Sequence, residues 1–113
     1  MDSLRARAGT PPPLVISVAV TPAIVSVQVG GELDAFTTCR LSAALSAVAL
    51  DGADHVQLDL RLLKFCDCAG ARLLLEFDRR ARRAGKRTTI HCAKPHIQKV
   101  LRLVADGDQP TFE

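Results

Sequence analysis

The stretch VQLDLRLLKFCDCAGARLLL, from Val56 to Leu75, decides the fold of this chain. Apolar residues alternate over Val56, Leu58 and Leu60, which predicts a strand near the middle of a parallel sheet with both faces covered. Leucines and a phenylalanine then recur at helical spacing as far as Gly85, a residue that commonly ends helices. The stretch therefore predicts a buried strand, a tight polar corner and a helix.

The polar corner reads Phe65-Cys66-Asp67-Cys68-Ala69-Gly70. Asp67 or Cys68 is expected at the N-terminus of the following helix, where unpaired backbone N–H groups and the helix dipole favour an acceptor. Asp67 is the natural capping residue.

This corner resembles the signature of STAS domains, the bacterial anti-sigma factor antagonists. The resemblance covers residues 14 to 104 and rests on three motifs: Leu63-x-Phe65-x-Asp67-x-x-Gly70, the upstream Gly31-Glu32-Leu33-Asp34, and the downstream Val100-Leu101-Arg102-Leu103. It implies a protein that binds an anti-sigma factor of the serine-kinase type and so regulates transcription that depends on a sigma factor. No catalytic activity and no cofactor are implied.

Cys68 departs from the STAS pattern. In the family this corner usually reads Asp-Ser-Ser-Gly, and the first serine is phosphorylated by the partner kinase. Here Cys68 stands in the place of the phosphoacceptor, and no Ser, Thr or Tyr lies between Ser46 and Thr88. We therefore expect an antagonist without the usual serine phosphorylation switch.

Composition indicates one ordinary globular domain. The chain has 113 residues, 48% hydrophobic residues and a formal net charge of +3, which by itself does not indicate a nucleic-acid partner. No apolar run approaches the roughly 20 residues of a membrane span, and no signal peptide is evident, so a cytoplasmic location is expected. Four cysteines in that compartment are expected to be reduced thiols.

The remaining elements follow in the order β-β-α-β-α-β-α, an α/β fold with a mixed STAS-like sheet of about four strands. We expect a flexible tail at residues 1–13, a domain at 14–104 and a polar, irregular C-terminal tail at 105–113. Within the domain, the expected elements are a hairpin of strands 15–20 and 24–29, a helix over 35–50 capped by Asp34, a strand over 87–92 and a helix that begins at Pro95.

Loops after parallel strands gather at one edge of a sheet, which brings together 30–34, 65–70 and 91–94. The resemblance implies that this edge docks on the anti-sigma factor through Asp34, Asp67, Cys68, Ala69 and Gly70. Gly70 would allow close approach of the partner's backbone. Asp34 and Asp67 could equally be helix caps and nothing more.

Other readings of the cysteines and charges remain open. Cys66, Cys68 and Cys92, with His91, could form a redox-responsive or metal-binding centre, although no standard metal-ligand spacing is present. Cys68 could also be a buried, inert substitute for serine. The domain could instead be a STAS signalling module in a larger complex.

The basic end of the second helix is expected to be solvated, with Glu76–Arg80 and Asp78–Arg82 pairs.

Overall fold

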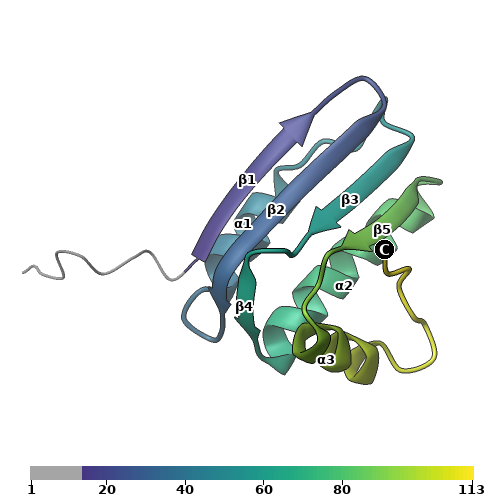
Figure 1. Cartoon of the computed structure of the whole chain (residues 1–113). Coiled ribbons are helices and arrows are strands. Elements are labelled where there is room, and N and C mark those ends of the chain that lie inside the picture. Colours follow the sequence, from purple (N-terminus) through teal and green to yellow (C-terminus); the bar gives the residue numbers. More distant parts are fainter. Residues whose placement is uncertain (1–13) are drawn as a thin grey trace, which may run out of the picture.

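The computed structural model describes residues 14–113, and the predicted tail at residues 1–13 lies outside that range. Figure 1 shows a twisted sheet with helices packed against it. The elements along the chain are β1 (Leu14–Val20), β2 (Ile24–Leu33), α1 (Thr38–Ser46), β3 (His55–Asp59), β4 (Leu63–Cys66), α2 (Cys68–Arg83), β5 (Arg87–His91) and α3 (Pro95–Ala105).

The sheet confirms the predicted mixed α/β class. Its main strand order is β1-β2-β3-β5, in which β1 is antiparallel to β2 and the other pairs are parallel. A fifth strand, β4, was missed by the sequence analysis because it has only four residues and follows β3 almost directly. β4 pairs with the last part of β2, while β3 pairs with its first part.

One face of the sheet carries the apolar core. Val27 and Leu58 pair across β2 and β3, are almost fully buried, and belong to a single core cluster with the inner sides of the helices. The alternate residues on the opposite face form a polar row of Ser17, Gln28 and Asp59. The expectation that both faces are covered is therefore wrong for this part of the sheet, where the strands alternate between an apolar and a polar side.

The helix expected over residues 35–50 is shorter than predicted. β2 does not stop at Gly30-Gly31 but continues to Leu33, because its last residues gain β4 as a new partner. Helix α1 then begins at Thr38 and ends at Ser46. Asp34 is consequently not its cap, which corrects that prediction.

The end of the chain lies along β5. The Ile90 amide donates to the Thr111 carbonyl (2.8 Å), and the Glu113 amide donates back to the Ile90 carbonyl (2.9 Å). The Arg102 guanidinium lies 4.8 Å from the centre of the Phe112 ring, which fastens this segment to α3. The polar segment therefore includes three residues that extend the sheet beyond β5.

Among residues 14–113, no helix combines the length and the apolar character needed to cross a membrane.

Candidate docking surface at the start of helix α2

The structure brings the three predicted loop segments to one end of the sheet. Leu33 of β2 pairs with Cys66 of β4, and the Asp67 amide donates to the Leu33 carbonyl at 3.1 Å. These bonds place the turn after β2 beside the turn after β4. The third segment lies beside the connection between β3 and β4, because the Leu60 amide donates to the His91 carbonyl at 3.0 Å and the Lys94 ammonium donates to the Arg61 carbonyl.

Asp67 caps α2 as predicted. Its carboxylate oxygen Oδ1 accepts a hydrogen bond of 2.8 Å from the Gly70 amide, one of the N–H groups that a helix start leaves without a backbone partner. Cys68 is the first residue of the helix, and its side chain is exposed. The corner therefore displays a thiol where the resemblance places a phosphorylated hydroxyl, and Cys68 is not the buried substitute considered above.

Gly70 is explained by packing inside the domain. The residue is buried, and a Cβ added to it would lie 2.4 Å from Cγ of Leu33. Helix α2 can thus approach β2 closely only because this position has no side chain. Close approach of a partner's backbone is not needed to account for this glycine.

Asp34 shapes a turn. Its Oδ1 accepts a hydrogen bond of 2.9 Å from the Phe36 amide, and the Asp34 amide donates to Oγ1 of Thr37 at 2.9 Å. The buried Thr37 hydroxyl also donates to the Glu32 carbonyl at 3.1 Å. The turn consequently holds Phe36 outward, with 93% of its surface exposed.

Phe36 was missed by the sequence analysis because the predicted helix included it. The signal that could have found it is its separation from the apolar stripe of that helix, which begins at Leu41. A large aromatic side chain beside polar turn residues and off the stripe is a candidate contact for another molecule.

All four cysteines are free thiols. Cys66 is buried and donates to the Asp67 carbonyl at 3.3 Å; burial, helped by the nearby Asp67 carboxylate, raises the pKa of its thiol to about 12. Cys39, Cys68 and Cys92 are exposed. Within residues 14–113, no group of three or more His, Cys, Asp or Glu side chains is placed to hold a metal ion.

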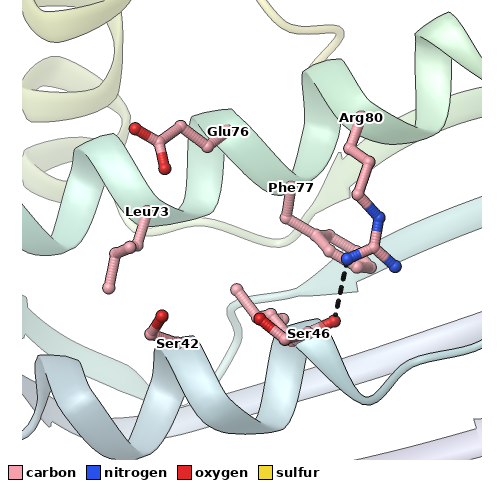
Figure 2. Close-up of a pocket in the computed structure, with 7 residues that line it drawn as sticks. Ser42, Ser46, Leu73, Glu76, Phe77 and Arg80 are labelled. Carbon is pink, nitrogen blue, oxygen red and sulfur yellow. Dashed lines mark hydrogen bonds between the residues drawn. The ribbon is translucent and has the colours of Figure 1, made fainter.

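A shallow groove runs between α1 and α2, beginning beside Ala69. Two adjoining hollows form it, with volumes of about 260 Å³ near the start of α2 and about 200 Å³ further along. Figure 2 shows the second hollow, with side chains from both helices facing one another across it. We call this feature the α1–α2 groove; its lining residues include Cys39, Ser42, Ala69, Leu73, Glu76 and Arg80.

Arg80 closes the far end of the α1–α2 groove. Its guanidinium donates to the carbonyls of Leu45 (3.2 Å) and Val48 (2.7 Å), at and just beyond the end of α1, where no further helical turn supplies amide donors. Figure 2 shows the first of these bonds. The predicted Glu76–Arg80 pair is thus replaced by a contact with α1. The predicted Asp78–Arg82 pair is present at 2.9 Å.

Fold and site together define a small α/β domain of the STAS type, with an exposed helix start at the end of an open sheet. A sequence-family profile described as "Mlab, STAS domain" matches residues 16–106. The chain therefore belongs to the STAS domain family.

Solved structures agree with this fold. An anti-sigma factor antagonist from Mycobacterium paratuberculosis is 21% identical, with a TM-score of 0.74 over 88% of this chain and 85% of that one. The anti-sigma factor antagonist SpoIIAA in its unphosphorylated form is 22% identical, with a TM-score of 0.68 over 88% of each chain. The phosphorylated form of SpoIIAA, a Bacillus cell fate determinant, is 22% identical, with a TM-score of 0.65 over 88% and 91%. No curated protein matches the sequence.

Proposed function

We propose that this protein is an anti-sigma factor antagonist of the cytoplasm, which binds an anti-sigma factor of the serine-kinase type and thereby frees a sigma factor. Support comes from its membership of the STAS family and from the exposed corner at the start of α2. The role is one of binding and involves no catalysis by this chain.

The observation that carries the proposal is the exposed Phe36 beside the α2 corner. An aromatic ring in water contributes little to folding, but on binding it can supply much of the contact energy of an interface. Phe36, Cys68 and Ala69 would contact the partner, with the α1–α2 groove beside them. Asp34, Asp67 and Gly70 would hold these contacts in place.

Such a surface fits a protein partner better than a small molecule. The hollows of the α1–α2 groove are shallow, and the exposed contacts spread over the turn before α1 and over two helices. A specific protein interface of ordinary size buries about 800 Å² on each partner. Burial of Phe36 at the centre of such an interface would make it a residue on which affinity depends strongly.

A binding measurement with matched exposed residues tests the docking surface. Phe36→Ala should weaken binding to the candidate anti-sigma factor at least tenfold in calorimetry, because the ring loses its contact. Leu103→Ala is the control, since Leu103 is also exposed (73%) but lies on α3. Equal effects of the two variants, or no binding by the wild type with or without reductant, would refute the proposal.

Cys68 makes the regulation testable separately. The partner kinase and radiolabelled ATP should leave the wild type unlabelled, because its helix start offers a thiol and no hydroxyl. Cys68→Ser should become labelled, and Cys39→Ser, which creates a serine on α1, should not. Label on the wild type would show that the serine switch has been kept elsewhere.

Control through thiols is the second candidate, favoured by the exposure of both Cys68 and Cys39 near the α1–α2 groove. Mild peroxide should then lower the affinity of the wild type for the partner and leave that of Cys68→Ser unchanged. Equal affinities before and after peroxide would exclude this control.

A further inference from the structure

The strand order β1-β2-β3-β5 has an outer strand at each end, and residues 14–113 cover the outer side of only one of the two. Along the outer side of β5, the segment Thr111–Glu113 takes up backbone hydrogen bonds. Strand β1 lies at the opposite edge, where its outer side has no neighbour within the described residues (Figure 1). One row of backbone N–H and C=O groups is therefore available for pairing.

Strand β1 also lacks the features that usually protect an edge. Its sequence, LVISVAV, contains no charged residue and no proline, and its register with β2 has no bulge. Three of its valines are exposed, Val15 by 53%, Val18 by 45% and Val20 by 69%. A seven-residue, uncharged, β-branched edge strand is suited to pair with another strand.

We propose that this edge is the interface of a homodimer, in which β1 pairs antiparallel with β1 of a second copy about a two-fold axis at Ser17. The proposal goes beyond the docking surface at the start of α2 and does not depend on it. The resulting sheet would run without interruption through both copies.

Hydrogen-bond geometry favours this register. The Thr21 amide donates to the Ile24 carbonyl at 2.9 Å, which marks a hydrogen-bonded pair of the hairpin. Because such pairs alternate with non-hydrogen-bonded pairs, the backbone groups of Ile16 and Val18 point away from β2. With Ser17 on the axis, Ile16 faces Val18 of the partner subunit. The backbone N–H and C=O groups of both residues point away from β2, so they can bond to one another.

Side-chain burial points the same way. Val18 and Val20 pair with the buried Val27 and Val25, so they lie on the core face of the sheet, yet both remain exposed. In the proposed register they would lie beside the partner's Ile16 and the partner's Leu14 on the same face. Apolar surface that the monomer exposes would thus be removed from water.

A second copy fits this edge because it is identical in length and equally uncharged, and because the assembly closes. Each copy has one β1 edge, and a two-fold pair uses both, so no β1 strand is left to extend the assembly. The ladder would be about 24 Å long. A contact of this size lies at the small end of specific interfaces, so a reversible dimer is expected.

Charge at the axis provides the test. Ser17 is exposed, and in the proposed register it faces Ser17 of the partner subunit at a non-hydrogen-bonded position, where Cα atoms are only about 4.5 Å apart. Ser17→Lys and Ser17→Glu should each weaken self-association at least tenfold, since like charges would meet. An equimolar mixture of the two variants should restore the dimer.

Sedimentation velocity from low micromolar to near millimolar concentration measures this association. The wild type should shift from 12.1 kDa towards twice that mass. Gln57→Lys, a charge on the same face but on β3, is the control and should still dimerise. A wild type that stays monomeric, as it would if its own N-terminal segment lay along β1, overturns the proposal. So does a dimer unaffected by Ser17→Lys, or a mixture that fails to associate.

Discussion

Two corners at one end of the sheet each begin with an aspartate, but their structures differ. At the α2 corner, Asp67 caps a helix that starts at the next residue and packs through Gly70 onto Leu33. At the α1 corner, Asp34 shapes a turn, and the helix begins only at Thr38, with no side-chain cap. The comparison shows that one corner is built tightly into the core, whereas the other displays a side chain, Phe36.

The largest effect is expected at the tight corner. Gly70→Ala should destabilise the protein by about 1 to 3 kcal/mol, because the added methyl group meets Leu33, which is fully buried. The better helix propensity of alanine offsets part of this cost. Urea unfolding measures the change. Gly107→Ala is the control, since nothing lies within 4 Å of a Cβ there; equal stabilities of the two variants would contradict the packing described.

Substitution of either aspartate should change the free energy of unfolding by less than Gly70→Ala. Asp67→Ala should cost about 1 kcal/mol in the free energy of unfolding, because the Gly70 amide loses its acceptor. Asp34→Ala should cost less, because it removes bonds within an exposed turn and leaves α1 unchanged. Thermal unfolding of both variants, with Asp67→Asn as a substitution that retains a cap, provides the comparison. A greater loss of stability for Asp34→Ala than for Asp67→Ala would contradict the description of the α2 corner as the more tightly built of the two.

At neutral pH, where the thiol is protonated in the folded and the unfolded chain alike, the smallest energetic effect concerns Cys66, one residue before the cap. Its pKa is raised to about 12 in the folded protein, above the ordinary value of 9.0, chiefly because the thiol is buried. The folded state therefore disfavours the thiolate. The free energy of unfolding should fall as pH rises above about 9, because the thiol then ionises in the unfolded chain while it stays protonated in the folded protein.

The same burial should be visible in alkylation. With iodoacetamide at pH 8, Cys39, Cys68 and Cys92 should react in the folded protein, and Cys66 should react only after unfolding. Mass spectrometry of the labelled peptides counts the sites. Rapid labelling of Cys66 in the native protein would show that the α2 corner opens easily.

Sequence patterns predicted the α2 corner better than the α1 corner, for a physical reason. Asp67, Cys68 and the start of the helix are local features, set by capping chemistry and apolar spacing within a few residues. The end of β2 depends instead on β4, whose Cys66 pairs with Leu33 across 33 residues of sequence and which is too short to stand out. Until that pairing is known, Ala35 and Phe36 look like the first turn of an alanine-rich helix.

Partner-binding roles at these corners were predicted from family resemblance alone, and the structure shows roles for Asp67 and Gly70 within the domain. The resemblance assigned Gly70 to close approach of a partner's backbone, whereas the structure places the Leu33 side chain of the same domain against it. Likewise, no local pattern links Arg80 to the carbonyls of α1, because that contact spans 35 residues.

The Arg80 side chain couples the movements of α1 and α2. Since one guanidinium joins the last turn of α2 to the end of α1, a molecule that pushes the helices apart at the Ala69 end must strain those bonds at the other end. We therefore expect α1 and α2 to tilt together about the Arg80 contact. A shortened side chain at that position would let the two helices hinge independently.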